Sequence, residues 1–241
     1  MSQNNPPGLL HLLPVGLGPG ESSKTHPPHV LATLDVLDYF IAERAKTARS
    51  ELKRLGYSRA IQSAEIHELP EQLDTRSIDT LLAPIRAGRD GGLMSEAGCP
   101  AVADPGALIV RRAHTLGIRV IPQVGPSSLL LALMASGLNG QGFAFHGYLP
   151  QKPDERRNAI QALERESAKF TRTQFFIETP YRNLAMFASL LEACREDTLI
   201  CVARSLTTAS EWVMTRRIGD WKKNGPPDLD RQPVVFLLLA S

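Results

Sequence analysis

Two carboxylates stand at the ends of a loop of small residues, SEAGCPAVADPG, at positions 95–106. Glu96 lies near its start and Asp104 near its end, and no long side chain lies between residues 97 and 103. Such a loop can fold closely around a small ligand, and it lies between a short strand and a helix, where α/β sheets bind ligands. We therefore expect a ligand-binding loop rather than a plain connector, although Asp104 before Pro105 also suits a helix cap.

A second loop, PVGLGPG at positions 14–20, follows the first apolar run. Gly16 and Gly18 give it a G-x-G-x-G spacing that lets the backbone approach a ligand, as in loops that hold a nucleotide or S-adenosylmethionine. Pro19 and two later prolines prevent a helix from starting at once, and no Gly-Lys-Ser/Thr phosphate loop is present. A simple turn at the end of a strand explains the pattern equally well.

Two further segments are candidate binding edges. VGPSS, positions 124–128, opens an apolar helix whose free N–H groups suit a carboxylate, while Ser127 or Ser128 would equally serve as an ordinary N-cap. ETPYRN, positions 178–183, places Glu178 and Arg182 after an apolar strand. No cluster of His, Cys and Asp has metal-ligand spacing, so we expect no metal site.

The net charge of +2, from 27 basic and 25 acidic residues, does not by itself indicate a nucleic-acid partner. Basic residues nevertheless gather in two stretches, and such clusters suit a polyanion held by phosphate contacts. Solvated helix faces are the equal alternative. The clusters are Arg44, Lys46, Arg49, Lys53, Arg54 and Arg59, and then Arg204, Arg216, Arg217, Lys222 and Lys223.

Apolar runs of strand length alternate with amphipathic helices along the chain. In the first half we expect strands at residues 9–15, 39–42, 61–69, 93–94 and 118–121, with helices between them. This alternation is typical of βαβ units and a mostly parallel sheet. The second half repeats it, with an alternating segment at 211–216 that we expect to be antiparallel and a closing strand at 234–240. We predict an α/β fold with two domains, residues 1–122 and 123–241.

Length and composition agree with this prediction. A chain of 241 residues with 43% hydrophobic and 22% charged residues fits two compact globular domains. Three cysteines without a CxxC spacing indicate neither a disulfide framework nor a zinc site. The apolar piece 129–135 is far shorter than the about 20 residues of a membrane span, and the start MSQNNPPG lacks a secretory signal pattern. We expect a soluble, cytoplasmic protein without a membrane partner.

Together the motifs resemble the tetrapyrrole (corrin/porphyrin) methylase family, and within it the branch called ribosomal RNA small subunit methyltransferase I, a ribose 2′-O-methyltransferase. The matches keep their order and spacing over nearly the whole chain. MSEAGCPAVADPG (94–106) resembles S-D-A-G-T-P-x-x-S-D-P-G, and PQVGPSS (122–128) resembles P-x-P-G-P-S-A. FHGYLPQKPDERR (145–157), FIETPYR (176–182) and ARSLTTASEW (203–212) resemble F-x-G-F-L-P-x-K-x-x-E-R, F-Y-E-S-P-H-R and A-R-E-L-T-K-x-H-E-E.

The chain departs from the branch at three places. PVGLGPGES stands where the branch usually has P-I-G-N, and it is closer to the V-G-x-G-P-G-D of tetrapyrrole enzymes. Glu43-Arg44-Ala45-Lys46 keeps only the glutamate of E-D-T-R, and Thr208 and Ser210 replace a lysine and a histidine. These departures bear on the target of the reaction more than on methyl transfer.

The resemblance implies two α/β domains with S-adenosylmethionine in the cleft between them, usually in a homodimer. Carried over by motif, the cofactor would contact Gly16, Gly18, Glu96, Ala97, Gly98, Asp104, Ser127, Ser128 and the backbone near Ile177. A ribose hydroxyl needs a base, and the candidates Glu96, Glu178 and Glu43 stay open. Arg44, Lys46, Arg49, Arg182 and Arg204 are the candidates for binding RNA phosphates.

Three functions follow from these observations. The leading prediction is an S-adenosylmethionine-dependent methyltransferase that acts on small-subunit ribosomal RNA, alone or within the ribosomal subunit. The second is a methyltransferase for a tetrapyrrole-like small molecule, which the GLGPG sequence favours. The third is a non-catalytic protein that has kept a cofactor pocket. Basic clusters around the mouth of the cleft would favour the first prediction, and an apolar pocket the second.

Overall fold

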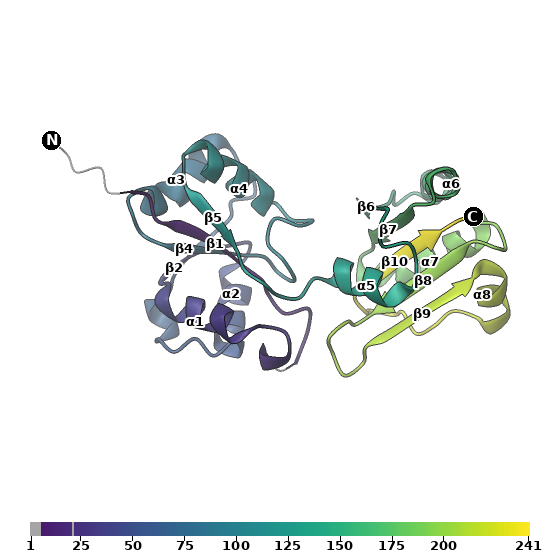
Figure 1. Cartoon of the computed structure of the whole chain (residues 1–241), viewed down its shortest axis with the longest axis horizontal. Coiled ribbons are helices and arrows are strands. Elements are labelled where there is room, and N and C mark those ends of the chain that lie inside the picture. The colour runs from purple at the N-terminus through teal and green to yellow at the C-terminus, as the bar shows by residue number, and fades with distance from the viewer. Residues whose placement is uncertain (1–5, 21) are drawn as a thin grey trace. The chain divides into compact units, whose positions relative to one another are not determined.

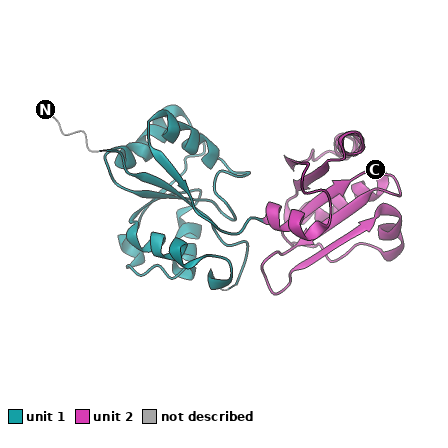
Figure 2. Cartoon of the chain, viewed as in Figure 1, with its two compact units in different colours: residues 1–127 teal, residues 128–241 magenta. Residues whose placement is uncertain are grey.

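The chain folds into two compact units, residues 1–127 and 128–241 (Figures 1 and 2). The computed structural model describes residues 6–20 and 22–241. Residues 1–5, part of the segment on which the expectation of no secretory signal rests, lie outside the described residues. The boundary predicted after residue 122 coincides with the end of a strand, and residues 123–127 connect that strand to the next helix. No helix among the described residues is long and apolar enough to cross a membrane.

The first unit contains a five-stranded parallel sheet with the order β3-β2-β4-β1-β5. Its strands are short and mostly buried, as expected for parallel strands covered on both faces. The strands are β1 (Leu9–Leu13), β2 (Tyr39–Ala42), β3 (Glu65–Glu68), β4 (Gly91–Met94) and β5 (Arg119–Pro122). The helices are α1 (Pro28–Val36), α2 (Ala45–Arg54), α3 (Thr75–Arg86) and α4 (Gly106–Thr115), with short 3-10 turns at Ser22–Lys24 and Ile61–Ser63.

Helices cover the two faces of this sheet in pairs (Figure 1). Phe40 and Ala42 of β2 pack with residues of α1 and α2, whereas Tyr39 and Ile41 pack with residues of α3 and α4. The alternation of side chains along a strand explains this division. β1 therefore continues into a helix on one face, and its neighbour β4 continues into a helix on the other. The point between two such strands is where open α/β sheets bind ligands.

The second unit contains a mixed five-stranded sheet with the order β6-β7-β10-β8-β9. β6 (Phe143–Tyr148) and β7 (Thr173–Ile177) are parallel, and the other neighbours are antiparallel. The antiparallel strand predicted at 211–216 is confirmed as β9 (Trp212–Arg217), and the closing strand is confirmed as β10 (Val234–Leu239). The remaining elements are β8 (Leu199–Arg204), α5 (Ser128–Ser136), α6 (Pro153–Phe170), α7 (Asn183–Ala193) and α8 (Ile218–Asn224).

The core of the second unit lies between one face of this sheet and the helices α6, α7 and α8. Ile160, Phe187 and Trp221, one from each helix, pack in a cluster with Phe176 and Phe236 of the central strands. The opposite face of the sheet carries α5. There the hydroxyl of Thr215 in β9 donates a hydrogen bond to the carbonyl of Ser136 at the end of α5, at 2.7 Å. Both units are thus α/β layers, as predicted.

One expected strand of the first unit is partly wrong. Residues 61–69 were expected to be extended throughout, but residues 61–63 form a 3-10 turn and only Glu65–Glu68 is a strand. The Ser63 hydroxyl donates to the Ala60 carbonyl at 2.7 Å, which stabilises the turn.

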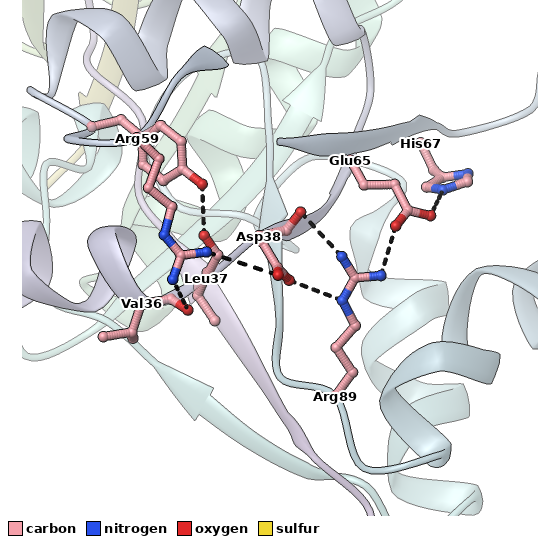
Figure 3. Close-up of polar contacts among 8 residues, drawn as sticks. Val36, Leu37, Asp38, Arg59, Glu65, His67 and Arg89 are labelled. Carbon is pink, nitrogen blue, oxygen red and sulfur yellow. Dashed lines mark hydrogen bonds and ion pairs between the residues drawn. The ribbon is translucent and has the colours of Figure 1, made fainter. Parts of the chain in front are cut away.

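Charged side chains join the amino ends of three strands of the first unit (Figure 3). Arg89, just before β4, donates from Nε to Asp38 Oδ1 at 2.9 Å and from Nη1 to Glu65 Oε2 at 2.6 Å. Its guanidinium also lies 5.0 Å from the centre of the Tyr39 ring. Arg59 lies on the other side of Asp38, with Nη1 3.8 Å from Oδ2. The edge of the sheet opposite the predicted loops is therefore held by ion pairs.

We predict that Arg89→Ala lowers the free energy of unfolding of the first unit by about 1 kcal/mol, since it removes two partly exposed ion pairs and one cation–π contact. Urea unfolding at pH 7 measures this loss. The loss should shrink as the pH falls below 4.5, the usual pKa of a glutamate, because Glu65, whose pKa is lowered by hydrogen bonds from His67 and Arg89, contributes its stability only while ionised. Arg86→Ala, on the exposed side of α3, is the control and should change the stability by less than about 0.5 kcal/mol. Equal losses in both variants would contradict the prediction.

Candidate functional site

Three predicted loops of the first unit meet at the carboxyl ends of β1, β4 and β5. The Val15 amide donates to the Gly98 carbonyl at 2.8 Å, and the Gly98 amide donates back to Val15 at 3.0 Å. Cys99 Sγ lies 3.5 Å from the Pro126 carbonyl oxygen. Gly125 lies so close to Pro14 that a Cβ added to it would be 2.3 Å from the proline Cβ. The glycine loop (residues 14–20), the small-residue loop (residues 95–106) and the turn at 124–127 are thus one surface.

The small-residue loop contains backbone conformations that L residues rarely adopt. Gly98, Ala101 and Ala103 all have positive φ, at 73°, 66° and 62°. The Asp104 carboxylate stabilises this path, because it accepts hydrogen bonds from the Ala101 amide at 2.9 and 3.0 Å and from the Gly106 amide at 2.6 Å. Burial raises the pKa of Asp104. Strained backbone of this kind concentrates at ligand-binding sites.

Two of the three predicted base candidates lie together beside these loops. Glu43 follows β2 and Glu96 follows the neighbouring β4, and the Glu96 amide donates to Glu43 Oε1 at 3.2 Å. The Thr47 hydroxyl donates to Glu96 Oε2 at 3.1 Å. Burial first, and then the negative charges of Asp104 and Glu96, raise the pKa of Glu43 against the effects of the Glu96 amide and Arg44. Glu43 is therefore a stronger base than an exposed carboxylate.

Free amide donors are available on both joined loops. The Gly18 and Ala97 amides donate to no group that the structure describes, whereas the Gly16 amide donates to Glu51 Oε1 at 2.7 Å. Backbone N–H groups without a protein partner bind carboxylate, phosphate and hydroxyl oxygens. These two amides therefore suit a small ligand that carries such oxygens. Within the described ranges, no group of three or more His, Cys, Asp or Glu residues could hold a metal ion.

The first basic cluster divides into free and paired cations. Lys46, Arg49 and Lys53 are exposed on α2, and their spacing of three and four residues places them on one helix face, the basic stripe. Arg44 is exposed at the N-cap of the same helix. In the described part of the chain none of these four forms an ion pair, whereas Arg54 pairs with Glu51 and Arg59 with Asp38.

Three candidate residues of the second unit, Glu178, Arg182 and Arg204, have partners within that unit. Glu178, whose side chain is fully buried, accepts hydrogen bonds at Oε1 from Arg182 Nε at 3.0 Å and Nη2 at 2.5 Å. Arg204 donates to the Asp228 carbonyl at 2.6 Å, and its guanidinium lies 5.6 Å from the centre of the Trp212 ring. Ile177 is the last residue of β7, and Ser128 is the first residue of α5.

Residues of the second basic cluster also have partners. Lys222 Nζ lies 2.5 Å from Glu196 Oε1 and Lys223 Nζ 3.8 Å from Asp220 Oδ1. The Arg216 guanidinium lies 5.0 Å from the centre of the Trp221 ring. This cluster is a solvated face with local ion pairs, which leaves the basic stripe of α2 as the better candidate for a polyanion.

The sequence analysis did not predict the contacts of two residues at this edge of the sheet. Thr47 contacts Glu96, and Glu51 contacts the backbone of the glycine loop. The spacing of Glu51 and Arg54, three residues apart on a predicted helix, was a signal for an ion pair. The sequence did not show which backbone the pair would contact.

Comparisons with known proteins agree with the motifs. The chain is 34% identical over 238 residues to ribosomal RNA small subunit methyltransferase I of Xylella fastidiosa strain Temecula1, covering 98% of this chain and 82% of the relative. It is 30% identical over 243 residues to the protein of the same name from Escherichia coli O157:H7, covering 100% of this chain and 80% of the relative. A scan against models of protein families gives no match.

Among solved structures, the fold is similar to that of the methyltransferase CobJ, with a TM-score of 0.63 and 19% identity over 97% of this chain and 95% of the other. This likeness confirms the predicted fold class. Together with the identity to the curated relatives over nearly the whole chain, it confirms the resemblance drawn from the loops. The chain belongs to the ribosomal RNA small subunit methyltransferase I family.

Proposed function

We propose that this protein transfers a methyl group from S-adenosylmethionine to a ribose 2′-hydroxyl of small-subunit ribosomal RNA. The observation that carries the proposal is the junction of the glycine loop and the small-residue loop by the backbone pair Val15–Gly98, at the point where the sheet's connections diverge. The names of the relatives support ribosomal RNA as the acceptor. The resemblance supports the ribose hydroxyl.

The cofactor would be held chiefly by backbone groups of the first unit. The free amides of Gly18 and Ala97 suit its polar oxygens, and Gly98 and Asp104 keep the small-residue loop in the required path. Bound there, S-adenosylmethionine supplies an electrophilic methyl group. The contacts carried over to Gly16, Glu96, Ser127, Ser128 and Ile177 complete the proposed set. Alignment of donor and acceptor by such a frame accounts for much of the rate of a displacement reaction.

Glu43 is the proposed general base. A ribose hydroxyl is a poor nucleophile at neutral pH, so a carboxylate that accepts its proton assists the attack. Glu43 has the raised pKa and the half-buried position that suit this role. Glu178 is assigned instead to the local structure of the second unit, because its Oε1 is bound by Arg182 and its side chain is fully buried.

RNA phosphates would bind to Arg44 and to the basic stripe, Lys46, Arg49 and Lys53. These cations are exposed, and α2 begins directly after Arg44 and Glu43. Arg182 and Arg204, proposed from the motifs, would contribute only if they released Glu178 and Asp228. A homodimer and a cytoplasmic location are further proposals that rest on the sequence.

The activity can be tested by transfer of labelled methyl groups to small ribosomal subunits from cells that lack this protein. We expect label in the RNA, at a linkage that resists alkaline cleavage because its 2′-oxygen is blocked. Label in a porphyrinogen and none in RNA would replace the proposal by the tetrapyrrole alternative. Binding of S-adenosylmethionine without turnover on either acceptor would indicate a non-catalytic protein.

We predict that Glu43→Gln lowers kcat by about 10²- to 10⁴-fold, the usual contribution of a general base. The affinity for S-adenosylmethionine should stay within about twofold, since glutamine still accepts the Glu96 amide. In the native enzyme kcat should fall as the pH drops through the pKa of Glu43, which lies above its usual 4.5, and the variant should lose this dependence. Glu96→Gln is the matched comparison. The full loss in Glu96→Gln with native kcat in Glu43→Gln would assign the base to Glu96.

We predict that replacing Lys46, Arg49 and Lys53 together by glutamine weakens RNA binding through loss of phosphate contacts. Each lost contact should reduce the slope of log K against log salt concentration by about 1. Filter binding at several salt concentrations measures this slope. Arg76→Gln, an exposed cation at the start of α3 on the other face of the sheet, is the control. An unchanged slope in the triple variant would place the RNA elsewhere.

A further inference from the structure

One ion pair on α2 contacts the glycine loop at two points, Gly16 and Gly20. Glu51 Oε1 accepts the Gly16 amide at 2.7 Å, and the side chain of Glu51 is only 11% exposed. Arg54 donates to both oxygens of this carboxylate, from Nε at 2.8 Å and from Nη2 at 2.5 Å. Its remaining nitrogen, Nη1, donates to the Gly20 carbonyl at 3.1 Å. The Glu51–Arg54 pair thus binds the backbone of the loop at Gly16 and again at Gly20.

The guanidinium also lies directly against the backbone of Gly16. A Cβ added there would be 2.3 Å from Arg54 Nη2 and 2.8 Å from Cζ. The arginine cannot easily move aside, because three of its nitrogens are hydrogen-bonded. Lysine cannot reproduce these contacts, since only arginine offers a planar fork of donors. A side chain at position 16 would therefore displace the guanidinium from these hydrogen bonds.

A loop with three glycines needs contacts from other segments to hold one conformation. Gly16, Gly18 and Gly20 each have more backbone freedom than other residues, and a free loop would lose that freedom on binding a ligand. The exchange between Val15 and Gly98 fixes only the start of the loop. The Glu51–Arg54 pair fixes the segment that contains Gly18, whose free amide is a proposed cofactor contact.

Neighbouring cations on α2 therefore have different roles. Lys53 is exposed on the basic stripe, whereas Arg54 is turned toward the glycine loop. We propose that Glu51 and Arg54 are positioning residues that shape the glycine loop for the cofactor, and that they contribute nothing to RNA binding. The inference rests on the proposed function, since it concerns the residues that would shape the proposed cofactor site.

Adjacent substitutions separate the two roles. Arg54→Gln should weaken the affinity for S-adenosylmethionine by about 10-fold or more in calorimetry and raise its KM, because the loop must then be ordered on binding. The kcat at saturating cofactor and the affinity for RNA should stay within about twofold. Lys53→Gln should show the reverse, with weaker RNA binding and native cofactor affinity. Arg54→Lys should behave like Arg54→Gln, because charge alone does not reproduce the fork.

A double-substitution cycle tests the contact itself. Gly16→Ala should weaken cofactor binding because its Cβ displaces the guanidinium, and it should add little once Arg54→Ala has removed that group. Losses that simply multiply would show that the two residues act independently, and would overturn the inference. Native cofactor affinity in Arg54→Gln, or a parallel loss of RNA affinity, would also overturn it. Failure of the native protein to bind S-adenosylmethionine would instead overturn the proposed function.

Discussion

The two backbone hydrogen bonds between Val15 and Gly98 are the constraint on which the candidate site depends. β1 and β4 are neighbours, but their connections leave for opposite faces of the sheet. The loops after them would therefore diverge if nothing joined them. The exchange of hydrogen bonds holds them together while the amides of Gly18 and Ala97 keep no partner in the described chain. The topology separates the two loops, and this backbone pair joins them where they begin.

Charged residues are arranged differently at the two ends of the strands of the first sheet. At the amino ends of the strands, the carboxylates of Asp38 and Glu65 pair with Arg89, and Arg59 lies beside Asp38 as a second cation. At the carboxyl ends, burial and then the nearby charges of Asp104 and Glu96 raise the pKa of Glu43. Like charges and left-handed backbone are costly, and proteins keep them chiefly where function needs them.

Much of the fold could be predicted because apolar periodicity and small-residue loops are local signals. The strand before Glu43 was expected at its observed residues, 39–42, and the strand before Glu96 was expected at 93–94, the last two residues of β4. Parallel order then brings their carboxyl ends to one edge. The partners of individual charges could not be predicted. The sequence makes Glu178 a candidate base, but its side chain is buried against Arg182. The sequence also places Lys53 and Arg54 in one basic cluster, although only Arg54 contacts the glycine loop. Such differences depend on side-chain direction and on distant backbone, which a single sequence does not encode locally.

The division within α2 also explains how a chain with a net charge of only +2 can offer a surface for a polyanion. Glu51 is the only acidic residue of this helix, and its charge is matched by Arg54. Because this carboxylate is turned toward Gly16, it does not neutralise Lys46, Arg49 or Lys53 on the exposed face. Any acidic residue placed on that face at a spacing of three or four would pair with them and weaken the local field. The contact that shapes the glycine loop and the positive potential beside it therefore have one origin, the inward orientation of Glu51.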